Sequence, residues 1–241
     1  MEEVQEGVCL LSTICCKMAL LQLGNLRGDM YFAIEGVIGV GKTTLGRLLQ
    51  PAFGAVLNLE VFEENPFLSS FYQDRARYAF QTQMFFLLSR YHQQRRSVPQ
   101  FLAEEKLVIS DYTFEKDALF ARINLVGDEL EMYFRVHKAL AEKIPLPDLV
   151  VYLRATTDTL MQRIALRDRP YERQMERAYI NELNQAYDAY YLEPSGHRSP
   201  VLVIDSNTLD YVRDPDHLHW VEERIRQDLR VAPYQPKLLE P

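Results

Sequence analysis

The sequence predicts an α/β fold, a three-layer sandwich in which helices cover both faces of a five-stranded parallel sheet. Three observations lead to this prediction. Short apolar runs alternate with stretches of helical periodicity along most of the chain. A glycine-rich loop separates the first apolar run from the first helical stretch. The chain has 241 residues, of which 47% are hydrophobic, and this is enough for one domain with a proper core.

Each element follows from its local pattern. Apolar runs too short for helices predict strands at 31–34, 55–60, 107–110, 148–153 and 200–204. Helical spacing predicts helices after residue 44 and at 74–96, 113–121, 128–143, 157–167, 172–191 and 217–229. Neither repeats nor linkers interrupt the pattern, so we expect one domain over 30–232, an N-terminal extension over 1–29 and a C-terminal tail over 233–241.

Residues 35–44 read EGVIGVGKTT and match the phosphate-loop template G-x-x-x-x-G-K-[ST]. Glycines let a backbone turn tightly and approach an anion, and the following helix N-terminus favours negative charge. The alternative is a turn that binds nothing, but the strand before it and the helix after it are the context that the template requires. We therefore expect a nucleoside triphosphate such as ATP to contact Gly36, Val37, Ile38, Gly39, Val40, Gly41, Lys42, Thr43 and Thr44.

Two carboxylates follow predicted strands. Because ligands collect at the carboxyl ends of parallel strands, residues 36–44, Glu60 and Asp111 should gather along one edge. Asp111 and the Thr43 hydroxyl suit Mg²⁺, although Asp111 could instead cap the helix after it. Glu60 is placed to accept a proton from a hydroxyl group. Spacing alone does not separate Glu60 from its neighbours Glu63 and Glu64.

Three arginines form the pattern R-x-x-x-R-x-R at Arg163, Arg167 and Arg169. The first two share a helix face, and the third lies beyond the predicted helix end. Phosphoryl transfer spreads negative charge over several oxygens, and arginines on a closing lid stabilise such charge. The alternative is a solvated basic surface. On the long helix, Gln83 and Arg90 lie near one face, and ordinary surface polarity explains them equally well.

Bulk properties exclude several function classes. The net charge is −7 without a block of basic residues, which argues against a nucleic-acid partner. The apolar stretch 8–23 is too short and too mixed to span a membrane, so we expect no membrane partner. All three cysteines precede the glycine-rich loop, and a cysteine-free core fits the cytoplasm. Met30 directly precedes the first strand, so residues 1–29 are interpreted as a poorly ordered extension or a start assigned too early; an anchor or interface helix is the alternative.

Together these residues resemble the deoxyribonucleoside kinase family, and the bacterial deoxyadenosine/deoxyguanosine kinases most of all. Beside the loop, the markers are EVFEENPFL (60–68), FYQDRARYAFQTQ (71–83), SDYTFEKDALFA (110–121) and RIALRDRPYE (163–172). The resemblance implies a P-loop kinase-type fold with an arginine-bearing lid. It also implies transfer of a phosphoryl group from MgATP to the 5′-hydroxyl of a purine deoxynucleoside, in a cytoplasmic homodimer.

The resemblance also implies roles for the substrate-facing residues. Glu60 falls where the family binds the 5′-hydroxyl and takes its proton. Tyr72 and Glu172 fall where the sugar 3′-hydroxyl is held, and the tyrosine crowds the place of a 2′-hydroxyl. The base-binding positions are occupied by a hydrogen-bonding side chain, a stacking ring and a charged pair of the purine/cytidine type: Gln83, Phe120, Arg90 and Asp117.

For the transfer itself, the resemblance implies that Lys42 and Arg169 stabilise the moving charge. It leaves Asp111 with two roles, as Mg²⁺ partner and as proton acceptor. The chain departs from the family pattern at Tyr112, where many relatives have an arginine, and this puts one substrate or phosphate contact in doubt. A second departure is Val61-Phe62, where the family usually has Pro-Val after the glutamate.

Two other functions remain open on the sequence. A nucleoside monophosphate kinase, such as a thymidylate kinase, shares the fold and the lid but needs a basic site for the acceptor's phosphate. A nucleotide-dependent switch or binding protein would have no use for the polar set Tyr72, Gln83 and Glu172. Adenine, guanine and cytosine cannot be separated by these patterns, because base choice depends on single hydrogen bonds in the folded pocket.

Overall fold

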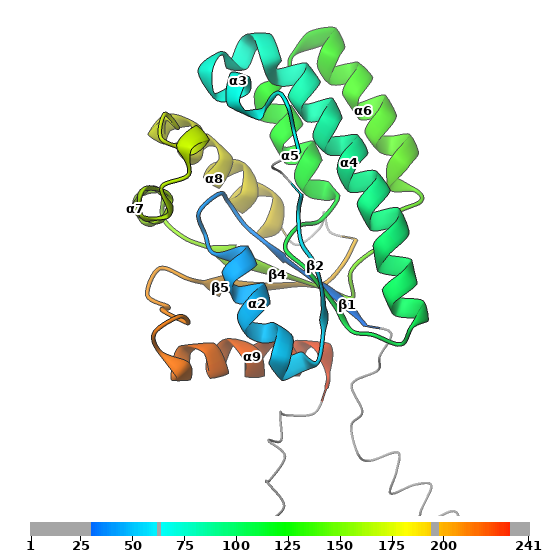
Figure 1. The fold of residues 1–241 in the computed structure, drawn as a ribbon, viewed down its shortest axis with the longest axis vertical. Coiled ribbons are helices and arrows are strands. Elements are labelled where there is room, and N and C mark those ends of the chain that lie inside the picture. Colours follow the sequence, from blue (N-terminus) through cyan, green and yellow to red (C-terminus); the bar gives the residue numbers. More distant parts are fainter. Residues whose placement is uncertain (1–29, 62–63, 194–197, 232–241) are drawn as a thin grey trace, which may run out of the picture.

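Five parallel strands form one sheet in the order β2-β3-β1-β4-β5 (Figure 1). The computed structural model describes residues 30–61, 64–193 and 198–231, so the predicted extension and tail lie outside the described residues. The strands are β1 (Tyr31–Glu35), β2 (Val56–Asn58), β3 (Val108–Ser110), β4 (Leu149–Arg154) and β5 (Val201–Asp205). Every pairing is parallel, which confirms the predicted fold class.

The central strand β1 is apolar from Tyr31 to Ile34 because both of its faces are covered. Phe32 packs edge-to-face on Phe53, the last residue of helix α2 (Lys42–Phe53), with ring centroids 5.4 Å apart. On the opposite face, Tyr31 and Ala33 pack with Val98 of helix α4 (Arg75–Ala103). A strand buried on two faces has no alternating polar positions, and this explains the continuous apolar run.

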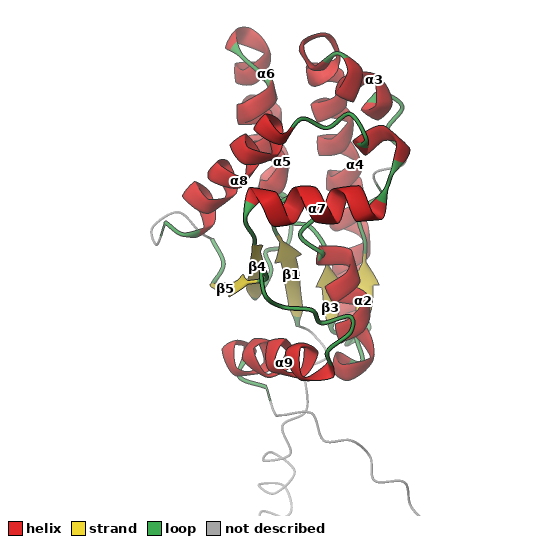
Figure 2. Ribbon diagram, turned by 90° about the vertical axis from the view of Figure 1, so that its left-hand side faces the viewer, coloured by secondary structure: helices red, strands yellow, loops and turns green. Residues whose placement is uncertain are grey.

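Helices form a layer on each side of the sheet (Figures 1 and 2). One layer contains α2 and α9 (Pro215–Leu229), and the other contains α4, α5 (Glu115–Asn124) and α8 (Arg177–Tyr191). The remaining elements pack outside these layers: α3 (Leu68–Gln73), α6 (Gly127–Ala141), α7 (Thr157–Arg167) and the short 3₁₀ helix η1 (Pro170–Glu172). In these described residues, no helix is long and apolar enough to cross a membrane.

Three elements differ from the sequence prediction. The helix expected over 172–191 is divided, because η1 ends at Glu172 and α8 begins only at Arg177. The long helix begins as predicted after Asp74, whose side chain accepts a hydrogen bond from the Arg77 amide at 3.3 Å. It continues past residue 96 through Pro99, because the burial of Val98 outweighs one missing backbone hydrogen bond. The separate helix α3 was not predicted.

The carboxyl ends of three strands meet at one edge, as predicted. β1 leads into the glycine-rich loop, β2 leads to Glu60, and β3 leads to Asp111. The backbone amide of Glu60 donates a hydrogen bond to Asp111 Oδ1 at 2.8 Å, which joins the ends of two strands. This edge carries the candidate site.

Candidate active site

The loop between β1 and α2 has a shape that only glycine permits at two positions. Gly36 has φ of +145°, and a Cβ atom there would lie 2.4 Å from the carbonyl oxygen of Leu153. Gly41 has φ of +107°, and a Cβ atom would lie 2.2 Å from the hydroxyl of Tyr211. A side chain at Gly36 would clash with the backbone, one at Gly41 would displace Tyr211, and both backbone conformations are strained for any other residue, so the loop path depends on these glycines.

The loop forms an anion-binding concavity at the start of α2. Gly41 is the N-cap residue of this helix, and no side chain caps its first amides. Lys42 Nζ donates hydrogen bonds to the carbonyls of Gly36 at 2.6 Å and Val37 at 3.2 Å, so its ammonium lies inside the curve of the loop. Unpaired helix amides beside a lysine are the arrangement that holds phosphate groups in other proteins.

Thr43 and Asp111 lie against each other across the sheet edge. The Thr43 hydroxyl donates a hydrogen bond to Asp111 Oδ2, while Asp111 Oδ1 accepts from the Glu60 amide. These oxygen donors fit Mg²⁺, which takes one or two carboxylates and completes its shell with water and substrate phosphates. The described residues contain no group of three or more His, Cys, Asp or Glu side chains that could hold a metal without such help.

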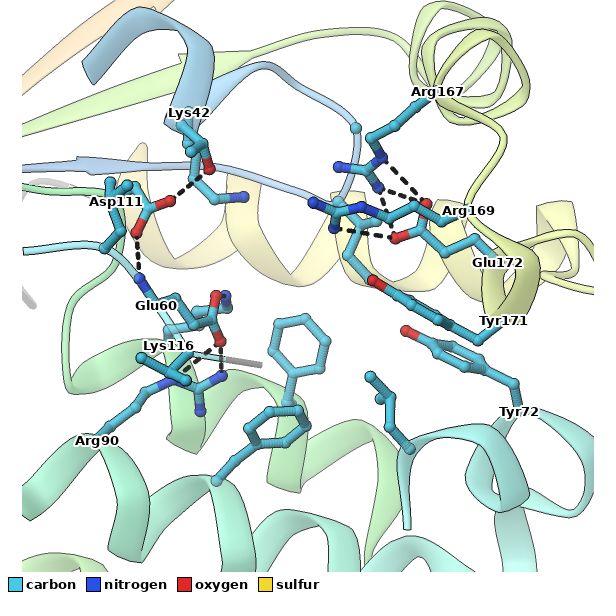
Figure 3. A pocket seen from close by; sticks show the side chains of 18 of the residues that line it. Lys42, Glu60, Tyr72, Arg90, Asp111, Lys116, Arg167, Arg169, Tyr171 and Glu172 are labelled. Carbon is cyan, nitrogen blue, oxygen red and sulfur yellow. Dashed lines mark hydrogen bonds and ion pairs between the residues drawn. The ribbon is translucent and has the colours of Figure 1, made fainter. Parts of the chain in front are cut away.

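A cavity of about 350 Å³ opens between this edge and the helical layer of α4 and α5 (Figure 3). We call it the inner cavity. Predicted site residues line two sides of it. Lys42, Thr43, Glu60 and Asp111 lie on one side, and Tyr72, Arg167, Arg169 and Glu172 lie on the other. Ligand sites in proteins have volumes of roughly 300–1,000 Å³, so this cavity has room for a small organic molecule.

Glu60 is held at the floor of the inner cavity by two cations. Its Oε1 accepts a hydrogen bond from Arg90 Nε at 3.1 Å, and its Oε2 accepts one from Lys116 Nζ at 2.5 Å. Burial alone would raise the pKa of this carboxyl, but the charges of Arg90 and Lys116 outweigh burial and hold the pKa well below its usual range. Arg90 also forms an ion pair with the fully buried Asp117. We call Glu60, Arg90, Lys116 and Asp117 the floor cluster.

The opposite wall of the cavity carries a second charged group on α7 and η1. Arg167 Nη2 donates hydrogen bonds to both carboxylate oxygens of Glu172, each at 2.6 Å. Arg169 Nη1 lies 3.7 Å from Oε1 of the same carboxylate. Beside them the rings of Tyr72 and Tyr171 stack, with centroids 6.2 Å apart and an angle of 13°. We call Arg167, Arg169 and Glu172 the lid cluster; Figure 3 shows it facing Glu60 across the cavity.

Arg163 lies apart from the other two arginines of its pattern. Its guanidinium donates to the Val40 carbonyl at 3.1 Å and to the Ser206 carbonyl at 2.6 Å, so it braces the glycine-rich loop. It lines a second cavity of about 640 Å³, the outer cavity, between α7 and the loop after β5. The glycine-rich loop borders both cavities, and Arg167 lines both.

The remaining predicted residues fall into two groups. Phe120 lines the inner cavity, together with Phe86 of α4. Gln83 is buried on α4 but does not line the inner cavity. Asp117 does not line the cavity either, although it pairs with Arg90, which does. Of the alternatives to Glu60, Glu64 is exposed and Glu63 lies outside the described residues.

Sequence reasoning missed Lys116, Tyr171 and Glu35. Lys116 shares a helix face with Leu119 and Phe120. A cation on an otherwise apolar helix face was the sequence feature that could have indicated a buried lysine. Glu35 is fully buried at the end of β1 and accepts from the Gly36 amide at 3.1 Å and the Thr113 amide at 2.5 Å. Burial raises the pKa of Glu35, although nearby Lys116 and Lys42 oppose this. It ties the glycine-rich loop to the segment after β3, and nothing in its local sequence indicated that contact.

The departure at Tyr112 also has a structural outcome. Its side chain is fully buried, and the Asn58 amide donates to its hydroxyl at 3.3 Å. Tyr112 does not line the inner cavity.

Comparisons with known proteins agree on one family. The family model described as deoxynucleoside kinase matches residues 32–229. The chain is 33% identical over 199 residues to the deoxyguanosine kinase of Bacillus subtilis, covering 82% of this chain and 96% of that protein. It is also 33% identical over 207 residues to the deoxyadenosine kinase of Dictyostelium discoideum, covering 82% and 79% respectively.

A solved structure agrees with the sequence matches. The structure of the deoxyadenosine kinase from M. mycoides with bound dATP superposes with a TM-score of 0.71 at 25% identity. The match covers 82% of this chain and 99% of that one.

Proposed function

This chain belongs to the deoxynucleoside kinase family and phosphorylates deoxynucleosides, and we propose that its acceptor is a purine deoxynucleoside, deoxyadenosine or deoxyguanosine. The donor in this proposal is ATP, and the product is the 5′-monophosphate that supplies nucleotide salvage. The matched relatives are named for deoxyguanosine and deoxyadenosine, which supports a purine base. The single observation that carries the proposal is the inner cavity, where an anion-binding loop and the carboxylate of Glu60 face one space.

The donor nucleotide lies along the glycine-rich loop in this proposal. The loop amides and Lys42 hold its β- and γ-phosphates, and the outer cavity takes its sugar and base beside Arg163 and Arg167. Thr43 and Asp111 hold Mg²⁺, which when bound neutralises phosphate charge. This arrangement directs the γ-phosphate from the loop into the inner cavity, toward Glu60.

The acceptor fills the inner cavity. Its 5′-hydroxyl lies at Glu60, its 3′-hydroxyl lies between Tyr72 and Glu172, and its base extends past Phe120 toward the Arg90–Asp117 pair. The stacked rings of Tyr72 and Tyr171 narrow the sugar end, which favours deoxyribose over ribose. Gln83 and the Arg90–Asp117 pair are proposed to select the base, and for Gln83 this requires a shift of α4 side chains.

In the transfer, the 5′-oxygen attacks the γ-phosphorus while the bond to the leaving ADP breaks. Glu60 orients the hydroxyl and accepts its proton as the new bond forms. We assign this role to Glu60 rather than Asp111, because Asp111 lies against Thr43 at the glycine-rich loop, where a carboxylate is suited to hold Mg²⁺. The lid arginines, Arg167 and Arg169, move onto the transferred group and stabilise its charge, so positioning and electrostatics supply most of the rate.

We also infer a homodimer in the cytoplasm. The surfaces of α4 and α6 leave Leu88 and Met132 exposed, at 42% and 56%, and apolar side chains on neighbouring helices are common in subunit interfaces. Light scattering on the purified protein should give twice the chain mass. A monomer across the working concentration range would overturn this part of the proposal.

The decisive experiment measures ATP consumption with deoxyadenosine, deoxyguanosine, deoxycytidine, thymidine and thymidine monophosphate in separate reactions. We expect turnover with one or both purines, weak turnover with thymidine and none with the monophosphate. Turnover with the monophosphate alone would replace the proposal with a nucleoside monophosphate kinase. Slow ATP hydrolysis that no acceptor changes would indicate a nucleotide-dependent binding protein.

A further inference from the structure

Lys116 is a buried lysine that the proposed mechanism does not use. It lies in the first turn of α5, is 6% exposed and lines the inner cavity. Its Nζ lies 2.5 Å from Glu60 Oε2 and 5.7 Å from the centre of the Phe120 ring. Lysine side chains are seldom buried to this degree unless their charge has a partner or a task.

Arg90 and Lys116 together balance the charges of Glu60 and Asp117, but only Arg90 pairs with both carboxylates. Arg90 is also fixed in place by its ion pair with Asp117 and by the Phe86 ring, 4.6 Å from its guanidinium. Lys116 has no comparable anchor among its described contacts beyond Glu60. Its ammonium sits on a flexible four-carbon stem, so it can change partner while Arg90 stays.

The charges around the cavity indicate where the ammonium would go. Lys42 of the glycine-rich loop lines the same cavity as Lys116, so two ammonium groups face one space. Two ammonium groups that approach one space repel each other until an anion lies between them. The anion of this reaction is the phosphoryl group that passes from the loop toward Glu60.

Glu60 itself requires the same movement. Its two oxygens are occupied, Oε1 by Arg90 and Oε2 by Lys116. Oε2 has a second lone pair for a hydroxyl group, but two adjacent cations make this carboxylate a poor proton acceptor, so it can take the proton readily only when one cation moves away. Lys116 is the cation that can leave, because Arg90 is held from two sides.

We propose that Lys116 is a catalytic residue that exchanges Glu60 Oε2 for an oxygen of the phosphoryl group in transfer. The acceptor hydroxyl takes the vacated carboxylate oxygen. As the 5′-oxygen bonds to phosphorus, its proton passes to Glu60 and the bond to ADP breaks. Lys116 remains protonated throughout and contributes only charge and hydrogen bonds. This inference rests on the proposed function of the inner cavity.

The test compares Lys116→Met, Lys116→Gln and Lys116→Arg with the wild-type enzyme. Methionine keeps the stem against Phe120 but removes the charge, glutamine keeps a hydrogen-bond donor for Glu60, and arginine keeps the charge. We expect the two neutral variants to lose about 10²- to 10³-fold in kcat, with the KM for ATP nearly unchanged. The arginine variant should recover at least part of this loss.

The matched control is Lys106→Met. Lys106 also pairs with a glutamate, Glu104, at 2.6 Å, but both side chains are exposed and remote from the cavity. This variant should retain wild-type kcat and KM. Thermal unfolding of each variant identifies any loss of folded protein before the rates are compared.

A binding measurement separates chemistry from packing. ADP, aluminium fluoride and the deoxynucleoside together imitate the transferred group between donor and acceptor, and ADP alone does not. Lys116→Gln should weaken the ternary complex at least tenfold and leave ADP affinity unchanged.

A lysine that only holds Glu60 in place predicts the opposite, since its loss would free the base and leave kcat equal or higher. A folded neutral variant with kcat within threefold of wild type would overturn the proposal. So would equal binding of the ternary mimic. If the wild-type enzyme fails to phosphorylate any deoxynucleoside, the proposed function fails first, and that result is read before any variant is compared.

Discussion

The floor cluster and the lid cluster contain the same kinds of ion pair but differ in how deeply their cations are buried. Each joins a glutamate to two cations, but the floor side chains Arg90, Lys116 and Glu60 are only 7–13% exposed, whereas those of Arg167 and Arg169 are about one-third exposed. The floor is built from a sheet edge, the 29-residue helix α4 and the ten-residue helix α5. The lid is built from the end of α7 and the three-residue helix η1.

This difference assigns the two clusters different tasks. Breaking a buried ion pair leaves an uncompensated charge away from water and is strongly unfavourable, so a floor cation can leave its carboxylate only when another anion takes its place. In the lid, Glu172 is buried but its arginines are about one-third exposed, so water and salt compete for the cations and a change of partner costs less than in the floor. We therefore propose that one wall holds the acceptor and that the other closes over it.

The largest expected effect is the loss of kcat when the carboxylate of the floor cluster is removed. Glu60→Gln should lower kcat by about 10²- to 10⁴-fold, because the amide cannot accept the hydroxyl proton. ATP affinity should stay close to wild type, since Glu60 does not touch the glycine-rich loop. Rapid-quench kinetics and ATP titration measure the two quantities, and Glu64→Gln, on an exposed neighbouring acid, is the control. An unchanged kcat would remove Glu60 from the mechanism.

The next effect concerns stability. Arg90→Met leaves Glu60 and the fully buried Asp117 short of one positive charge, and it should lower the free energy of unfolding by about 3–5 kcal/mol. Arg167→Met, in the lid, should lower it by less, because Arg167 is about one-third exposed and Arg169 remains 3.7 Å from Glu172. Urea unfolding at neutral pH measures both. Equal losses would mean that the two clusters do not differ in rigidity.

A smaller effect should appear when the lid loses an arginine. Arg169→Gln should lower kcat by about 10- to 100-fold, the equivalent of one or two hydrogen bonds to a charged group. Its stability should match wild type, which separates lid chemistry from floor packing. Single-turnover assays with saturating ATP and deoxynucleoside measure the loss. A variant with full kcat would show that Arg169 stays at the surface during transfer.

The smallest effect tests Lys42, which lies between the two clusters. Burial, followed by the charge of Lys116, lowers the pKa of Lys42 to about 8. Phosphates favour the charged form, so above pH 8 ATP binding should take up protons and weaken by at most about tenfold per pH unit. Below pH 7 this uptake should vanish.

Calorimetry at pH 8.5 and 6.5 in buffers of different ionisation enthalpy measures the proton uptake. Lys116→Met removes the neighbouring positive charge, so it should raise the pKa of Lys42 and move the uptake to higher pH. An uptake that is equal at both pH values would contradict the assignment to Lys42.

Some of this molecule was determined by the sequence itself. The strands were predictable because a strand buried on two faces is an unbroken apolar run, as β1 is. The loop was predictable because Gly36 and Gly41 occupy conformations and spaces that exclude side chains. The edge position of Glu60 and Asp111 followed from the general geometry of parallel sheets.

Only the tertiary structure decided how these parts meet. The pairing of Glu60 with Arg90 and Lys116 joins residues 30 and 56 positions apart, and the contact of Glu35 with Thr113 spans 78 positions. Local patterns carry no information on such contacts, because they depend on how α4 and α5 pack over the sheet edge. The same packing separated Arg163 from Arg167 and Arg169, which the sequence presents as one group. Charge partners are chosen by burial and distance in the folded chain, and neither quantity can be read from spacing along it.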